Sequence, residues 1–241
     1  MNSKHYIIGD VHGEFDMLMA LVAKLPKNAR LIFVGDLINR GLKSKEVIAF
    51  VRNNAFAVVQ GNHECYILDN ANFFLESIEC YRKDKSKNFW SRLNGTETLR
   101  SYGLVTDEID DEVYILDNPS IIEQLKEDLA WIASLPCYLE LGKFEGYDLP
   151  IVVTHGSAGD YWHLKDENFQ RFKQICQSNR EAPSEDASIF NIYGHVIHSE
   201  VKVAKNHICV DTGSGKTFEG AKLSAYCVES REIFEVKREE I

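Results

Sequence analysis

The sequence predicts an α/β fold built on a parallel sheet, with a second sheet later in the chain. Three short apolar runs typical of buried strands occur within the first 60 residues, at 6–8, 31–34 and 55–59. Helical patterns separate these runs, and further strands return after a helix-rich middle segment. Strands that alternate with helices are typical of a parallel sheet whose two faces are both buried.

Both helices between these runs carry apolar residues at helical spacing. Residues 14–25 place apolar side chains on one face, and Pro26 ends that helix. The second helix begins at Ser44, a favoured N-cap residue, and carries Val47 and Val51 one turn apart. These helices and strands make up the βα units expected of the parallel sheet.

The middle and end of the chain follow different patterns. Residues 65–136 are mostly helical in pattern, with the clearest helix at 120–135. We expect this segment to be a helical insertion within a single domain spanning residues 1–241, because no linker composition or repeat interrupts the chain. The spacing of the later strands predicts a second, largely antiparallel sheet. These strands are residues 138–141, 151–154, 189–193, 200–203, 207–210, 224–228 and 233–236.

The composition limits the classes of partner. The chain has 241 residues, and 27 Lys+Arg against 37 Asp+Glu give a net charge of −10. This acidic excess disfavours nucleic acid and anionic membranes as partners. No apolar run is long enough to span a membrane, and we expect no signal peptide because the N-terminal residues run directly into the first predicted strand. We expect a cytoplasmic monomer whose six cysteines, none in a CxxC pair, are free thiols.

Polar side chains follow five of the predicted strands at the point where each strand ends. Because the carboxyl ends of strands in an α/β sheet face one crevice, we expect these side chains to lie together. They are Asp10, His12, Asp36, Asn62, His155 and His195. Carboxylate oxygens combined with imidazole nitrogens suit Mn²⁺, Zn²⁺ or Fe. The set is too large for one ion and sufficient for two that share a bridging carboxylate.

Five short motifs occur in a fixed order along the chain: GDVHG, GDLINRG, GNHE, THG and YGH. In this order they resemble the PPP-type metallophosphoesterases, and most closely the small bacterial and phage serine/threonine protein phosphatases. The resemblance extends from residue 6 to at least residue 213. It implies a four-layer αββα sandwich of the calcineurin-like type, with the site at the carboxyl ends of the strands.

The resemblance also implies two metal sites that share a carboxylate. The first ion would be held by Asp10, His12 and Asp36. The second would be held by Asp36, Asn62, His155 and His195, so that Asp36 bridges the pair. We expect Mn²⁺ at these sites, with Fe or Zn²⁺ as alternatives.

The same resemblance implies how phosphate would be bound and cleaved. A metal-bridging hydroxide would attack phosphorus directly, and His63 would protonate the leaving alkoxide as a general acid. Arg40 and a second arginine would bind the phosphate, because guanidinium groups match phosphoryl oxygens with paired donors. The segment Ser178-Asn179-Arg180 resembles the WNR stretch of the phage enzymes, so we choose Arg180 and keep Arg171 as the alternative.

One position departs from the pattern of the protein phosphatases, which read GDxxDRG. Asn39 stands at the position of the second Asp of this motif. In the protein phosphatases that Asp orients the general-acid histidine, which corresponds to His63 here. Asn39 can accept a hydrogen bond through its amide oxygen, but without a charge it should raise the pKa of His63 less. Relatives that hydrolyse dinucleoside polyphosphates also lack this carboxylate, although their motif ends in GNHD and this chain has Glu64.

We therefore expect metal-dependent hydrolysis of phosphomonoesters, either phosphoserine and phosphothreonine in proteins or small phosphoesters. Hydrolysis of dinucleoside polyphosphates is the alternative. A nuclease and a catalytically idle phosphoprotein-binding module are the remaining alternatives.

The C-terminal part contains two further polar segments near predicted strands. Asp211 follows a strand and either supports the site or forms a simple turn. Residues 213–217, GSGKT, look like the end of a nucleotide-binding P-loop. Because Val210 stands where the first glycine of that motif is required, we expect a glycine-rich turn instead.

Overall fold

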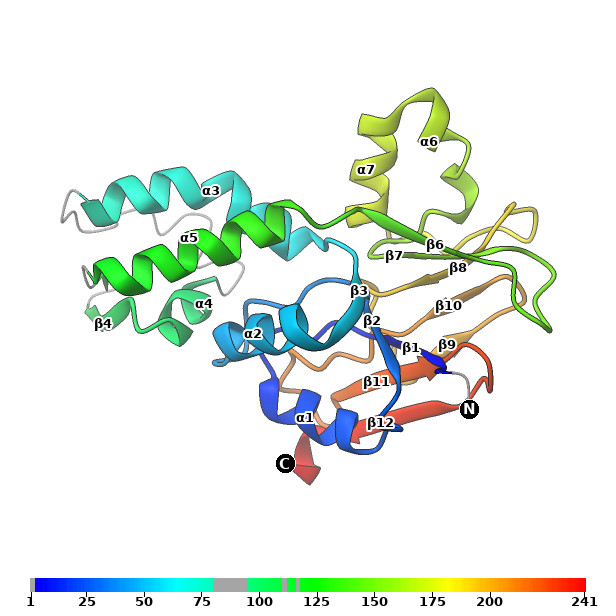
Figure 1. Cartoon of the computed structure of the whole chain (residues 1–241), viewed down its shortest axis with the longest axis horizontal. Coiled ribbons are helices and arrows are strands. Elements are labelled where there is room, and N and C mark those ends of the chain that lie inside the picture. The colour runs from blue at the N-terminus through cyan, green and yellow to red at the C-terminus, as the bar shows by residue number, and fades with distance from the viewer. Residues whose placement is uncertain (1–2, 80–94, 110–111, 116–117) are drawn as a thin grey trace.

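Two five-stranded sheets pack face to face in the computed structural model of the chain, which describes residues 3–79, 95–109, 112–115 and 118–241 (Figure 1). The first sheet has the order β12-β11-β1-β2-β3. Its strands are β1 (His5–Ile8), β2 (Arg30–Phe33), β3 (Ala55–Val58), β11 (Lys222–Cys227) and β12 (Ile233–Lys237). The strands β1, β2 and β3 are parallel, as predicted, whereas β11 runs antiparallel to β1 and β12 runs antiparallel to β11.

The apolar side chains of the parallel strands point alternately to the two faces of the first sheet, and so belong to two separate parts of the hydrophobic core. Ile8 and Phe33 face the helices α1 (Phe15–Ala23) and α2 (Ser44–Asn54), which cover the outer face of the first sheet. The intervening residue Ile7 faces the second sheet. Successive side chains of a strand point to opposite faces, so both faces of this sheet are buried.

The second sheet has the order β6-β7-β8-β10-β9. Its strands are β6 (Tyr138–Gly142), β7 (Ile151–Thr154), β8 (Phe190–Tyr193), β9 (Lys202–Val203) and β10 (His207–Cys209). The inner strands β7, β8 and β10 are parallel, and only the two edge strands run antiparallel. The prediction of a largely antiparallel sheet is therefore wrong.

Two features explain this error. A helical crossover, not a hairpin, joins β7 to β8, and it contains η2 (Gly159–Tyr161), α6 (Leu164–Glu167) and α7 (Phe169–Ser178). Parallel neighbours need such a crossover. In addition, the last two predicted strands belong to the first sheet, as β11 and β12. Figure 1 shows α6 and α7 beside the second sheet, so that helices lie outside both sheets.

The insertion is helical for most of its described length and also contains a hairpin that was not predicted. Its elements are α3 (Asn62–Glu79), α4 (Thr96–Ser101), β4 (Val105–Ile109), β5 (Glu112–Ile115) and α5 (Pro119–Ala133). Figure 1 shows α3 and α5 extending together beyond the sheets. The remaining residues of the predicted insertion, 80–94, 110–111 and 116–117, lie outside the described residues.

An ion pair attaches the insertion to the rest of the fold. Asp128 of α5 pairs with Arg52 of α2, and within the insertion it accepts a hydrogen bond from the Tyr102 hydroxyl at 2.6 Å. Apolar residues of α3 and α5 belong to the same core cluster as α1 and α2.

Two further properties concern the described cysteines and helices. The cysteines within the described ranges are free thiols; Cys80 lies outside them. None of the described helices combines the length and the apolar character needed to cross a membrane.

Candidate metal centre and phosphate pocket

All six predicted ligand side chains meet at the carboxyl ends of β1, β2, β7 and β8 and at the start of α3. Asp10, Asp36, Asn62 and His195 line a pocket of about 310 Å³. The other two, His12 and His155, are buried at 1% and 0% exposure. The structure thus brings together side chains that are up to 185 residues apart in the sequence.

The loops that carry these side chains have an unusual backbone. Five residues of the site that are not glycine have positive φ: His12 at 50°, Asp36 at 51°, Asn39 at 70°, Arg40 at 70° and His195 at 66°. Such conformations cost free energy in L-residues and persist where surrounding contacts hold them. Here the backbone N–H of His12 donates to the carbonyl of Asp36 at 2.8 Å, which joins the loops after β1 and β2.

A first cluster of acceptor atoms surrounds Nε2 of His12. Its Nδ1 donates to the carbonyl of Ile38 at 3.0 Å, so its Nε2 carries a lone pair in the neutral ring. That Nε2 is buried without a hydrogen-bond partner, 3.6 Å from Oδ2 of Asp36 and 3.9 Å from Oδ2 of Asp10. A buried acceptor facing two carboxylates is unfavourable unless a cation lies between them.

A second cluster forms around His155 and His195. His155 donates through Nδ1 to the carbonyl of Val34 at 2.9 Å, and His195 donates through Nε2 to the carbonyl of Ser178 at 3.2 Å. Their opposite ring nitrogens are 3.2 Å apart and both carry lone pairs.

Two oxygens complete this second cluster. Oδ1 of Asn62 lies 2.9 Å and Oδ1 of Asp36 lies 3.3 Å from the Nε2 of His155. Four hydrogen-bond acceptor atoms therefore lie close together, and none of them carries a hydrogen that it could donate to another. This donor set of two imidazole nitrogens, a carboxylate and an amide oxygen fits a divalent cation.

Asp36 connects the two clusters through its two carboxylate oxygens. Its Oδ2 faces the first cluster and its Oδ1 faces the second. Burial by itself would raise the pKa of Asp36, whereas the imidazoles of His155, His63 and His12, when protonated, and the backbone N–H of His63 lower that pKa below its usual range. Burial, Asp211 and Asp36 raise the pKa of Asp10. Buried carboxylates this close together are best satisfied by shared cations.

A close backbone approach fixes the position of Asp10. The N–H of His195 donates to both carboxylate oxygens of Asp10, at 3.2 and 3.3 Å. At Gly194 an added Cβ would lie 2.2 Å from Oδ1 of Asp10. Only glycine permits this approach.

His63 sits beside the clusters with both ring nitrogens facing donors. Its backbone N–H donates to Oδ1 of Asp36 at 2.9 Å. Its Nδ1 accepts a hydrogen bond from the Asn39 amide at 2.9 Å, and the Arg40 guanidinium lies 3.4 Å from its Nε2. Burial lowers the pKa of His63 to about 4, and Arg40 contributes to that shift.

The expected direction of the Asn39 hydrogen bond is therefore wrong. The amide oxygen of Asn39 accepts instead from the hydroxyl of Thr98 in the insertion, at 2.7 Å. With its oxygen occupied, Asn39 presents its NH₂ group to His63. No local pattern indicates this partner, because Thr98 lies 59 residues further along the chain.

Three cationic side chains line the pocket. Arg40 and Arg180 were predicted, and Lys216 was not. Arg171 lies on α7 and is not among the lining residues, so the structure brings Arg180, and not Arg171, to the clusters. None of the three lining cations forms an ion pair with an acidic group of the described residues.

Two acidic residues outside the predicted ligand set also belong to the site. Glu64 accepts hydrogen bonds from the backbone N–H groups of Asp36 at 2.7 Å, Leu37 at 2.8 Å and Gly61 at 2.9 Å. Its place at the end of the GNHE motif was the available signal. Asp211 lines the pocket and accepts from the N–H of Gly213 at 2.9 Å, so it is part of the site and also forms the local turn.

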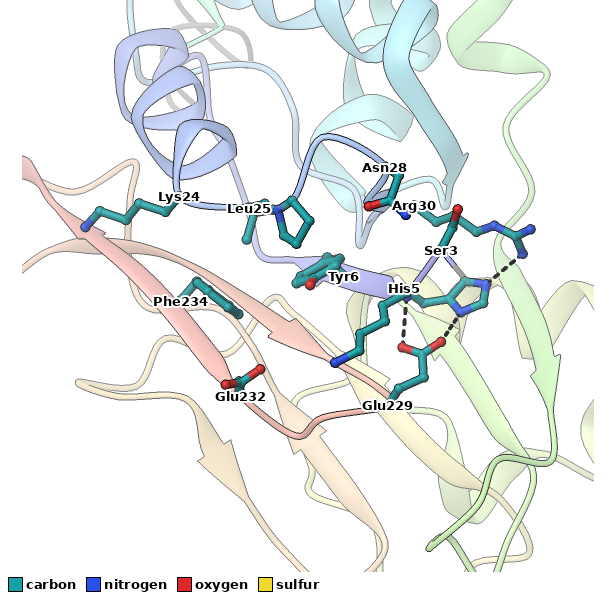
Figure 2. Close-up of a pocket in the computed structure, with 12 residues that line it drawn as sticks. Ser3, His5, Tyr6, Lys24, Leu25, Asn28, Arg30, Glu229, Glu232 and Phe234 are labelled. Atoms are coloured by element: carbon teal, nitrogen blue, oxygen red, sulfur yellow. Dashed lines mark hydrogen bonds and ion pairs between the residues drawn. The ribbon is translucent and has the colours of Figure 1, made fainter. Parts of the chain in front are cut away.

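A larger hollow of about 1210 Å³ lies at the opposite end of β1 (Figure 2). Figure 2 shows His5 at its wall, in contact with Glu229 and Arg30. Nδ1 of His5 lies 2.7 Å from Oε1 of Glu229. The two groups of residues that are able to hold a metal within the described ranges lie at the first pocket, not here. The smaller pocket is therefore the candidate site.

The chain is similar to known phosphoesterases over most of its length. Residues 4–229 match the family model of calcineurin-like phosphoesterases. Over 239 residues the chain is 24% identical to serine/threonine-protein phosphatase 2 of Escherichia coli strain K12. That match covers 94% of this chain and 95% of that protein. The family predicted from the five motifs is thereby confirmed.

Two further similarities are local or concern the fold alone. Over 69 residues the chain is 44% identical to the symmetrical bis(5'-nucleosyl)-tetraphosphatase of Neisseria gonorrhoeae strain NCCP11945, which covers 27% of this chain and 25% of that enzyme. The solved structure of a provisionally assigned diadenosine tetraphosphatase aligns with a TM-score of 0.58 at 15% identity, covering 98% of this chain and 94% of that one. This alignment confirms the predicted fold class.

Proposed function

Because the chain belongs to the calcineurin-like phosphoesterase family, we propose that it hydrolyses phosphomonoesters with two divalent metal ions, acting on phosphoserine and phosphothreonine in proteins. One observation carries this proposal. Two clusters of buried acceptor atoms, with no protons between them, share Asp36 and open into a pocket that Arg40, Arg180 and Lys216 also line.

The residues of the two clusters divide between the two ions. Asp10, His12 and Asp36 would hold one ion, and Asp36, Asn62, His155 and His195 the other. When bound, the ions supply Lewis-acid polarisation of the phosphoryl oxygens and lower the pKa of water. Mn²⁺ suits this mixture of carboxylate and imidazole ligands, and Fe and Zn²⁺ accept the same set.

The remaining side chains bind the substrate and assist the leaving group. Arg40 and Arg180 bind the phosphoryl oxygens through paired N–H donors. His63 accepts from Asn39 at Nδ1, so in the neutral ring the proton is on Nε2, the nitrogen beside Arg40. From there it donates a hydrogen bond toward the leaving oxygen.

The similarity to a serine/threonine-protein phosphatase supports protein substrates, because it extends over nearly the whole of both chains. The similarity to the tetraphosphatase is confined to about a quarter of each chain. Substrate choice depends on the whole pocket wall, including the insertion, so the longer match has the greater weight.

A specific contact favours dinucleoside polyphosphates as a second candidate. The hydrogen bond from Asn39 leaves Nδ1 of His63 without a carboxylate partner, which makes His63 a weaker acid than a histidine whose Nδ1 is paired with an aspartate. A phosphoanhydride releases a less basic leaving group than a serine ester does, and it depends less on a proton donor.

A metal-reconstitution experiment tests the proposal. The purified protein is dialysed against a chelator, its metal content is measured, and Mn²⁺ is returned in steps. We expect activity on a phosphoserine peptide to disappear and then recover. His155→Asn should lower both metal content and activity, whereas His163→Asn, at an exposed position, should change neither.

The same assay with diadenosine tetraphosphate separates the two candidates. A higher kcat/KM for the dinucleotide than for the peptide would favour the second candidate. Full activity of the metal-stripped protein on both substrates would contradict the proposal as a whole.

A further inference from the structure

Lys216 is a third cation in the pocket, beyond the two arginines that the proposed chemistry uses. We propose that Lys216 determines specificity by binding a second phosphoryl group, linked through an anhydride to the one that is cleaved. This inference rests on the proposed hydrolysis at the metal centre. It adds phosphoanhydride chains, as in inorganic or nucleoside polyphosphates, to the substrates of the site.

The turn that carries Lys216 is attached to the loop that carries the predicted metal ligands. The hydroxyl of Ser214 donates to the carbonyls of Asp10 at 2.5 Å and Val11 at 3.2 Å. At Gly215 an added Cβ would lie 2.5 Å from the Cβ of His12, so the turn packs directly against that ligand. The position of Lys216 is thus fixed relative to the metal centre.

The C-terminal end of the chain holds the other side of the turn. Arg238, in η3 (Arg238–Glu240), donates through Nε to the carbonyl of Lys216 at 3.1 Å and through its terminal nitrogen to the carbonyl of Ser214 at 2.5 Å. Glu14 pairs with the same guanidinium at 2.7 Å. The N–H of Lys216 donates to the carbonyl of Gly213 at 2.9 Å. The backbone of Lys216 is therefore held on both sides.

The ammonium group of Lys216 lies in the same pocket as two other cations, Arg40 and Arg180. The Arg40 guanidinium lowers the pKa of Lys216, burial adds to this effect, and Arg180 acts in the same direction. Asp211 opposes them, but its carboxylate accepts from the N–H of Gly213. Within the described ranges no ion pair neutralises Lys216. Three cations that line one pocket without an ion pair among the described residues favour a ligand with several negative charges.

The number of donors indicates a second phosphoryl group. Two guanidinium groups already offer paired donors to the terminal oxygens of one phosphoryl group. Lys216 lines the same pocket of about 310 Å³ as both arginines. A directly linked phosphoryl group fits within such a space, whereas an acidic side chain of a phosphopeptide is separated from the phosphate by a stretch of backbone.

The reaction on such a chain balances with water alone. Water adds to the terminal phosphorus, and the bond from that phosphorus to the bridging oxygen breaks. The bridging oxygen leaves on the second phosphoryl group, which Lys216 holds. The products are orthophosphate and a chain that is one phosphate shorter.

Inhibition by two phosphonates tests the role of Lys216. Hydrolysis of p-nitrophenyl phosphate is followed at fixed free Mn²⁺, with methylenediphosphonate or methylphosphonate as the inhibitor. In Lys216→Met we expect the Ki of the diphosphonate to rise about 10-fold, the effect of losing one hydrogen bond to a charged group. The Ki of methylphosphonate should rise much less. Lys216→Arg should retain the preference, as should Lys202→Met, at an exposed lysine on β9.

Two results would overturn the proposal. One is an equal change of both Ki values, or none, in Lys216→Met. The other is an unchanged diphosphonate Ki in Lys216→Met, together with a higher KM for phosphopeptides flanked by acidic residues than for those flanked by alanine. That result would mean that Lys216 binds a carboxylate of the peptide. Absence of p-nitrophenyl phosphate hydrolysis by the wild-type protein would instead contradict the proposed function, and calorimetric titration with the two phosphonates would still test Lys216.

Discussion

The side-chain amide of Asn39 donates a hydrogen bond to Nδ1 of His63 over 2.9 Å. The orientation of that amide is set by Thr98, whose hydroxyl donates to Oδ1 of Asn39 at 2.7 Å. A residue of the insertion thus decides which end of Asn39 meets the histidine. As a consequence, Nδ1 of His63 is an acceptor, and a protonated ring would have to break this bond.

We expect Asn39→Asp to strengthen acid catalysis by His63. An aspartate would accept from Thr98 and from a protonated Nδ1, and would favour the imidazolium. The kcat/KM for phenyl phosphate, whose leaving group is strongly basic, should rise by at least about 10-fold, within the usual range for general acids. The kcat/KM for p-nitrophenyl phosphate should rise less. Equal effects on the two substrates would show that His63 does not protonate the leaving group.

Removal of metal should destabilise the protein through Asp10. Saturation with Mn²⁺ at 100 times its Kd stabilises a folded protein by about 2.7 kcal/mol, or about 5–10 °C in Tm for a chain of this size. We expect Mn²⁺ to raise the Tm of Asp10→Asn much less than that of the wild type. In chelator, the Tm of Asp10→Asn should be no lower than that of the wild type, because a carboxylate buried among other carboxylates destabilises the fold when no cation is bound. Thermal unfolding with and without Mn²⁺ measures both effects. Asp186→Asn, at an exposed position, should behave as wild type.

The fold was predictable wherever local pattern determines structure. The runs at 6–8, 31–34 and 55–59 became β1, β2 and β3, because their apolar residues fill both sides of one sheet. The direction of the strands in the second sheet was not predictable in this way. Apolar patterning shows which faces of a strand are buried, but not whether its neighbour runs parallel to it.

The site was predictable to the extent that short motifs fix it. The residues of GDVHG and GDLINRG lie where neighbouring parallel strands end, so their convergence follows from the fold. The hydrogen bond between Asn39 and Thr98 depends on how the insertion packs against the sheet, and no local pattern encodes that contact. The place of Lys216 in the pocket was not predictable from GSGKT, because the turn is positioned by tertiary contacts with Asp10 and His12.

Replacing Glu64 should affect both stability and metal binding. Glu64→Ala leaves three backbone N–H groups at the loop after β2 and at Gly61 without their acceptor. We expect a loss of at least about 2 kcal/mol in the free energy of unfolding, together with weaker Mn²⁺ binding because Asp36 loses its support. Urea unfolding and a metal titration measure the two effects. Glu185→Gln, which removes only an exposed ion pair with Lys205, should cost under about 1 kcal/mol.

A buried histidine outside the site should make stability depend on pH. Burial lowers the pKa of His207, and Lys202 adds to that shift. Below the ordinary histidine pKa of about 6.5 the unfolded chain binds a proton that the folded His207 does not, so the free energy of unfolding falls as pH decreases. We expect His207→Gln to weaken this dependence below about pH 6.5. Identical pH profiles of unfolding for the two proteins would contradict the assignment.

The two candidate arginines should differ sharply in a substitution experiment. Arg180 lines the pocket with the metal-ligand clusters, whereas Arg171 lies on α7 outside the lining, although both belong to the segment that follows the same strand. Loss of a charge-assisted contact to phosphate costs about 1.5–3 kcal/mol, or about 10- to 100-fold in kcat/KM. We therefore expect Arg180→Gln to lower kcat/KM for a phosphoserine peptide by that factor and Arg171→Gln to change it less than about 2-fold. A greater loss in Arg171→Gln would mean that α7 moves toward the substrate when phosphate binds.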